Sequence, residues 1–325
     1  MNRYSVGSRL MRASAPQPQP PPACGFAGVA RACALATLLM LGACDGGARP
    51  IDAQAQPPAS SAELSVRFDL SAGSAASVSV LGFRAATAGS DDADVLGLVD
   101  PLAAAAPDQG CAIRDADLAT RALASRGGSV DLEELPGVAV GLGSEASLLR
   151  PFPRVFPDVA GVVAGVVAES GPQAVSALPE RVTFYSPESE LPVGELPVPA
   201  LPRLLAINGA APVAGARIDA SEGLTLALGS AAGAVVELRP FGATVAVTCS
   251  VPTNASTESL LTISRPLLAH LPSRVAAGGS SRAGSGAVAV SLEVVRRVRA
   301  KAPLGASPTR VSVEVRAALP VELRP

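Results

Sequence analysis

The side chains that usually carry catalysis are scarce in this chain. His270 is the only histidine and Lys301 is the only lysine. A Ser-His-Asp hydrolase would have to use His270, and no Gly-x-Ser-x-Gly motif presents a nucleophilic serine. Catalytic zinc usually needs two or three imidazoles, which a single histidine cannot supply. The surroundings of the single lysine match neither a Walker motif nor a Ser-x-x-Lys motif. We therefore expect no enzymatic activity and assign His270 a surface or capping role.

Clustered carboxylates are the remaining candidates for chemistry. Asp91, Asp92 and Asp94 fall in the segment GSDDADVLG, and hard oxygen ligands at alternate positions suit calcium. The twelve-residue EF-hand pattern with its terminal glutamate is missing, so a solvated acidic loop is the preferred interpretation. A carboxylate-based hydrolase is a further alternative, but nothing in the sequence places two carboxylates across a cleft. We predict no metal site and no cofactor, with these aspartates as weak calcium candidates.

Cysteines and charge limit the compartment and the partners. Cys111 and Cys249 are a candidate disulfide for an oxidising compartment, with two buried thiols as the alternative. The densest basic cluster, at 296–301, is interpreted as one solvated strand face, with a lipid or polyanion contact as the alternative.

No basic stretch is interleaved with aromatic residues, so we predict no nucleic-acid partner. The chain has no tryptophan and two tyrosines, which disfavours a sugar-stacking surface.

The N-terminal 43 residues have the features of an export signal. Asp and Glu are absent before Asp45, arginines precede an apolar run at 32–43, and that run is shorter than the about 20 residues of a bilayer span. The run ends in Leu41-Gly42-Ala43-Cys44, which resembles the lipobox of bacterial lipoproteins. The resemblance implies cleavage before Cys44 and acylation of its thiol; an ordinary secretion signal is the alternative.

The mature chain after that cleavage would have 282 residues and a net negative charge, with 22 basic against 28 acidic residues. Its first segment, 44–61, is rich in Ala, Pro, Gly, Gln and Ser without apolar periodicity. Such a segment cannot bury a core, so we predict a flexible tether. Asp45 follows the cysteine, but the sequence leaves open which membrane and leaflet hold the anchor.

Apolar residues alternate with polar ones in many short runs of the body. Leu64, Val66 and Phe68 form one such run, and Val311, Val313 and Val315 form another. A period of two predicts half-buried strands, and the frequent Gly and Pro residues between the runs favour an all-β fold. The strands predicted after residue 202 span 203–207, 215–218, 223–228, 233–239, 243–250, 258–264, 287–299 and 309–323.

Helices are predicted to be few and short. The best candidate spans 115–125, with Asp115 as a cap and Gly127 as a stop, and one turn is expected at 265–271. The segment 158–169 is ambiguous between a small-residue helix and a buried strand, and it is assigned to a short helix. Four prolines in 191–202 predict an extended edge and connector, and a flexible loop is expected at 278–286.

These elements predict two β-rich domains, at 62–190 and 203–325, joined by the connector 191–202. The strand number and length of the second domain resemble an immunoglobulin-like antiparallel sandwich, although the paired core cysteines and the tryptophan of antibody domains are absent.

The body also resembles uncharacterised lipoproteins from high-GC bacteria of the myxobacterial type. The stretches that carry this resemblance are LRPFPRVFPDVAGVVAGVVAE at 149–169, the segment 196–218 that begins LPVPA, and VAVTCSVP at 245–252. It implies export, a two-part β-rich body and no known activity. From the residues themselves we expect a non-enzymatic, lipid-anchored protein of the cell envelope that binds an envelope or extracellular protein partner. The alternatives are a calcium-stabilised adhesion module and, less favoured, a secreted hydrolase.

Overall fold

The structure is a computed structural model of the 325-residue chain. It describes residues 59–71, 76–88, 99, 107, 110–135, 137–143, 148–159, 161–186, 191–254, 257–277, 287–304 and 308–324. The predicted signal, Cys44, the tether as far as residue 58, the three calcium candidates Asp91, Asp92 and Asp94, and the loop 278–286 lie outside the described residues.

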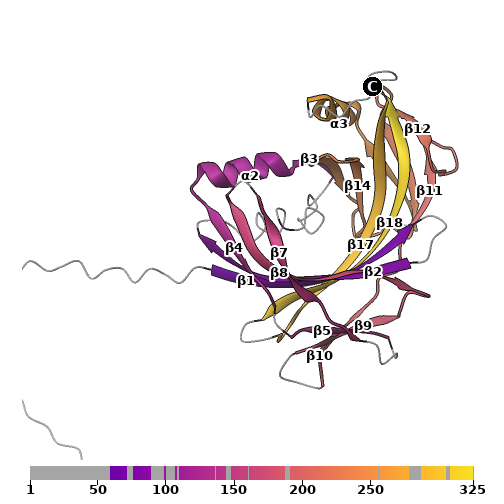
Figure 1. Ribbon diagram of the computed structural model, residues 1–325. Helices are drawn as coiled ribbons and strands as arrows, with labels where there is room; N and C mark the ends of the chain where they lie inside the picture. Colours follow the sequence, from indigo (N-terminus) through magenta and orange to yellow (C-terminus); the bar gives the residue numbers. More distant parts are fainter. Residues whose placement is uncertain are drawn as a thin grey trace, which may run out of the picture. The chain divides into compact units, whose positions relative to one another are not determined.

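The described part of the chain is mostly β-structure, which confirms the all-β prediction (Figure 1). Eleven of its strands form one large sheet. In spatial order they are β3 (Gly110–Asp115), β15 (Val245–Ser250), β14 (Val235–Pro240), β17 (Val288–Ala302), β18 (Thr309–Arg324), β1 (Ala59–Ser71), β2 (Ala76–Ala88), β4 (Ser129–Glu133), β8 (Val163–Val175) and β7 (Phe152–Val159), with β12 (Ala216–Asp219) beside the end of β18.

The centre of this sheet joins the two ends of the described chain. The first strand, β1, pairs in parallel with the last, β18, from Glu63 opposite Arg310 to Ser71 opposite Ala318. At the edge of the sheet β3 pairs with β15, which again joins the N-terminal half of the chain to the C-terminal half. Residues 56–325 form one compact unit.

The predicted division into domains at 191–202 is therefore corrected. The sequence signals for a boundary were local, whereas the pairs that join the two halves are separated by more than a hundred residues along the chain. The immunoglobulin-like arrangement is also not confirmed, because β18 pairs in parallel with both β1 and β12 instead of lying in a separate antiparallel sandwich.

Two smaller sheets cover one face of the large sheet, which we call the packed face. The first contains β10 (Pro192–Pro197), β9 (Arg181–Tyr185), β5 (Ala139–Leu142) and β6 (Leu148–Leu149), and the second contains β11 (Arg203–Ile207), β13 (Leu224–Gly229) and β16 (Glu258–Ile263). Figure 1 shows β5, β9 and β10 beneath β1 and β2. As the prolines predicted, β10 lies at a sheet edge.

Each small sheet forms its own apolar core with the packed face. Val66 and Phe68 of β1 pack in one cluster with Val182 and Phe184 of β9. In the second cluster, residues of β14, β15 and β17 pack with those of β13 and β16 and with Leu268 of α3 (Arg265–Ala277). A fully buried side chain of this size contributes about 1.5–3 kcal/mol, so these clusters hold the layers together.

The opposite face of the large sheet carries a third apolar cluster at one end. Phe83 lies opposite Glu63, so its side chain is on the face away from Val66 and Phe68. There it packs with Val130, Val163 and Leu123 of α2 (Ala116–Ser125). The carboxylate of Asp115 accepts hydrogen bonds from the backbone N–H groups of Asp117 and Leu118, which confirms its predicted role as the N-cap of α2.

The predicted helix at 158–169 is wrong. The chain ends β7, turns at Gly161 with a φ of 69°, and enters β8 at Val163. Gly165 has a φ of 132°, and a Cβ there would lie 2.1 Å from the carbonyl oxygen of Leu132 in β4. Gly161 is thus needed for a turn and Gly165 for a close strand-to-strand approach. The turn expected at 265–271 is correct in place but too short, since α3 continues to Ala277.

Candidate functional site

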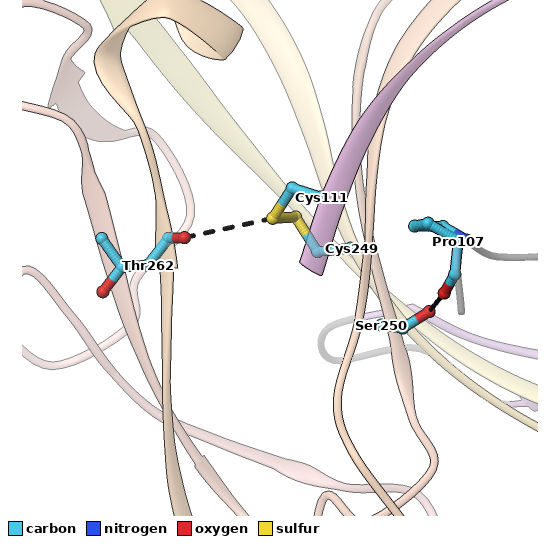
Figure 2. The surroundings of a disulfide bond; sticks show 5 residues. All are labelled: Pro107, Cys111, Cys249, Ser250 and Thr262. Carbon is cyan, nitrogen blue, oxygen red and sulfur yellow. Dashed lines mark hydrogen bonds between the residues drawn. A yellow bond between two sulfur atoms is a disulfide. The ribbon is translucent and has the colours of Figure 1, made fainter. Parts of the chain in front are cut away.

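The structure joins Cys111 and Cys249 in a disulfide, with their Cα atoms 4.0 Å apart (Figure 2). The two residues lie directly opposite each other on β3 and β15, at the edge of the large sheet. Cys249 is buried in the core with Val245 and Val247. The bond closes a separation of 138 residues and so links the two halves of the body.

The surroundings of the disulfide contain no reactive partner among the residues drawn in Figure 2. The Sγ atom of Cys111 lies 4.0 Å from the carbonyl oxygen of Thr262, and an oxidised cysteine has no S–H to donate, so this is a packing contact. Beside it, the Ser250 hydroxyl donates to the carbonyl of Pro107 and holds that residue against the sheet edge. This arrangement suits a structural bridge.

Other residues selected from the sequence do not converge. His270 lies exposed on α3, and Lys301 lies exposed on β17. The described residues include no group of three or more His, Cys, Asp or Glu side chains arranged to hold a metal ion. Within the same residues, no helix has the length and apolar character needed to cross a membrane.

The strongest electrostatic feature is a set of charged side chains that we call the charged face: Arg67, Glu293, Arg297, Glu314 and Arg316. It lies on the same face of the large sheet as Phe83, over β1, β18 and β17. Glu314 is fully buried. Arg297 Nε donates to its Oε2 at 2.7 Å, and Arg316 Nη2 donates to its Oε1 at 2.8 Å. Arg67 Nε lies 3.4 Å from the same Oε1, so three guanidinium groups surround one carboxylate.

The three arginines determine the protonation of Glu314. Burial raises the pKa of a carboxyl group, but Arg297, Arg316 and Arg67 together outweigh it and lower the pKa of Glu314 to about 2. Glu237 of β14 is the opposite case on the same face. Burial raises its pKa, and the opposing attraction of Arg239 is smaller. The neighbours of Glu314 therefore favour its anionic form, whereas burial disfavours the anionic form of Glu237.

Two predictions from the sequence are corrected by this face. The cluster at 296–301 is not one solvated face, because Arg297 is 12% exposed and ion-paired with Glu314, whereas Arg296 points to the other side of β17 and donates to the carbonyls of Ala200 and Ser230. The strand at 309–324 is not half-buried, because Ser312 and Glu314 are as buried as the alternating Val311, Val313 and Val315. Since each arginine of the charged face is ion-paired with a glutamate of the same face, we assign the network a structural role.

A pocket of about 490 Å³ lies on the packed face, where the end of the connector and β11 meet β1, β17 and β18. We call it the seam pocket. Its described lining consists of Leu70, Leu201, Pro202, Arg203, Leu204, Leu205, Pro212, Leu292, Val294, Ala317, Ala318 and Leu319. The floor is formed by β17 and β18, where Leu292 lies opposite Leu319 and Val294 lies opposite Ala317. Leu292 and Leu319 belong to or pack against one core, whereas Leu70 and Leu201 pack against the other.

The seam pocket follows from the path of the connector. After β10 the chain leaves one small sheet, passes Leu201 and Pro202, and enters the other small sheet at β11. A β-bulge between Leu204 and Ala206 turns Leu205 outward, where it is 40% exposed. Sequence reasoning missed this pocket, although the row of leucines and prolines at 201–205 was a signal that apolar side chains gather in the connector.

No family model, no curated protein and no solved structure matches this chain at a significant level.

Proposed function

We propose that this chain is an exported, non-enzymatic protein, held in the bacterial cell envelope by a lipid on Cys44, whose β-rich body binds a partner. The observation that carries the export part is the Cys111–Cys249 disulfide. Disulfides persist in oxidising compartments and are rare in the bacterial cytosol. This supports the same compartment as the leader that ends in Cys44, and two acyl chains would give a stable anchor where one gives a marginal one.

The seam pocket supports binding in place of catalysis. Its described lining contains no Ser, Thr, Cys, His, Asp or Glu, so it offers no nucleophile, general base or metal ligand. Its volume of about 490 Å³ lies within the usual range of small-molecule sites. A hollow of this composition can hold an apolar group but can do no chemistry on it.

Membrane fractionation combined with protease treatment of intact cells tests this function, on the wild type and on Cys44→Ala. We expect the wild type in the membrane fraction and the variant in the soluble fraction. Digestion of the wild-type body on intact cells would indicate an extracellular partner, and protection would indicate a periplasmic one. A wild-type protein that is soluble, or a variant that stays membrane-bound, contradicts anchoring through Cys44.

A further inference from the structure

The seam pocket combines an apolar interior with one charged residue. Of its described lining residues, Arg203 alone carries a charge. Leu292 and Val294 on the floor are 1% and 3% exposed, whereas Arg203 is exposed. The guanidinium group therefore lies at the rim, and the floor offers only aliphatic surface.

Arg203 is also available for a ligand. Within the described part of the chain it has no ion pair, in contrast to Arg297 and Arg316 on the charged face. A guanidinium group at the rim of an apolar pocket is complementary to a ligand with an anionic head and an alkyl body, because the head gains a charge-assisted hydrogen bond while the chain leaves water.

We propose that the seam pocket binds a single-chain anionic amphiphile of the fatty-acid type, with its alkyl chain over Leu292 and Val294 and its carboxylate at Arg203. The inference names a ligand for the proposed binding role and does not depend on lipidation of Cys44. An added peptide strand fits less well, because the bulge at Leu205 interrupts the register of the β11 edge and Pro202 lacks an N–H.

Equilibrium dialysis with radiolabelled hexadecanoate and hexadecanol, below their aggregation concentrations, tests this proposal. The full-length chain is exported so that its disulfide forms, and it carries Cys44→Ala so that no protein-borne acyl chain competes for the pocket. We expect saturable binding of one hexadecanoate per chain. No saturable binding of either probe would overturn the proposal.

Two substitutions locate the site. Ala317→Phe fills the pocket above the floor and should weaken hexadecanoate binding at least tenfold, while the matched control Ala122→Phe, on the exposed side of α2, should not. Leu205→Glu at the exposed rim is a second variant, used if circular dichroism shows that Ala317→Phe does not fold. We expect it to weaken hexadecanoate binding, because it places a negative charge beside the anionic head. Undiminished binding by whichever of these variants folds would place the ligand elsewhere.

Arg203→Gln tests the head group. It should weaken hexadecanoate about three- to fivefold, the effect of losing one exposed charge pair, and leave hexadecanol unchanged. Arg121→Gln on α2 makes the same change of net charge and should alter neither probe. Equal effects of Arg203→Gln on the acid and the alcohol would refute the role of Arg203. These assays do not report where the protein resides, so a failure here and a failure of the fractionation experiment are distinguishable.

Discussion

Replacing Glu314 by glutamine should lower the free energy of unfolding by about 3 kcal/mol at neutral pH. The magnitude follows from the pKa of about 2 that Arg297, Arg316 and Arg67 impose on this buried carboxyl group, against about 4.3 in an unfolded chain, at 1.36 kcal/mol for each pH unit. It agrees with the about 3–5 kcal/mol lost when one partner of a buried ion pair is removed. The amide keeps the shape of the side chain but leaves the three guanidinium groups without their shared anion.

The stabilisation by Glu314 depends on pH. Because the folded-state pKa of Glu314 lies below the unfolded value, the unfolded chain binds more protons between about pH 4.3 and pH 2. The stabilisation by Glu314 is thus fully present above that window and is lost as the pH falls through it. The difference in stability between the wild type and Glu314→Gln should shrink across this window.

Urea unfolding followed by circular dichroism at pH 7, 5, 4 and 3 measures both effects, since the chain has no tryptophan for fluorescence. Glu237→Gln is the matched control. It replaces another buried carboxylate on the same face, but burial raises the pKa of Glu237, so ionisation of this group does not stabilise the fold at pH 7 and its loss should cost less than the loss of Glu314. The proposed role of Glu314 would be refuted if the free energy of unfolding of Glu314→Gln lay within about 0.5 kcal/mol of the wild type. It would also be refuted if Glu314→Gln and Glu237→Gln lost equal stability.

Three further predictions address the fold and the calcium alternative. Gly165→Ala should lower the free energy of unfolding by about 3 kcal/mol or more, because alanine would need a positive φ and its Cβ would clash with the backbone of β4. Gly171→Ala on the same strand is the control, because a Cβ there meets nothing within 4 Å. It should change the stability by less than about 1 kcal/mol in urea unfolding. Cys249→Ser, or reduction of the wild type, should lower the stability by about 2–5 kcal/mol given the 138-residue separation, and reduction of a Cys111→Ser/Cys249→Ser double variant should change nothing further. The melting temperature should be the same in calcium and in chelator; a rise of several degrees with calcium would instead support the adhesion module.

Local features of the fold could be predicted from the sequence. Period-two alternation located β1 and the strands from β11 to β18, and the turn residues between them separated these strands. Asp115 and Gly127 marked the ends of α2 because capping depends on neighbouring backbone groups. Such signals depend on only a few consecutive residues, so they can be recognised without knowledge of the tertiary structure.

Non-local features could not be predicted. The parallel pairing of β1 with β18 joins residues at opposite ends of the described chain. The sequence of either strand contains no signal that identifies the strand with which it pairs. For the same reason the contacts of Arg67 and Arg297 with Glu314 could not be predicted, because only the folded sheet brings these residues together inside the protein. The seam pocket is lined by residues that pack against both apolar cores, so it exists only once both cores have formed.

The most direct test of the envelope assignment is the mass of the N-terminal peptide of the mature protein, purified from cell membranes. The account predicts a peptide that begins at Cys44 and carries a diacylglyceryl group on its thiol. An unmodified Cys44, whether at the terminus or still joined to Ala43, would contradict the lipid anchor.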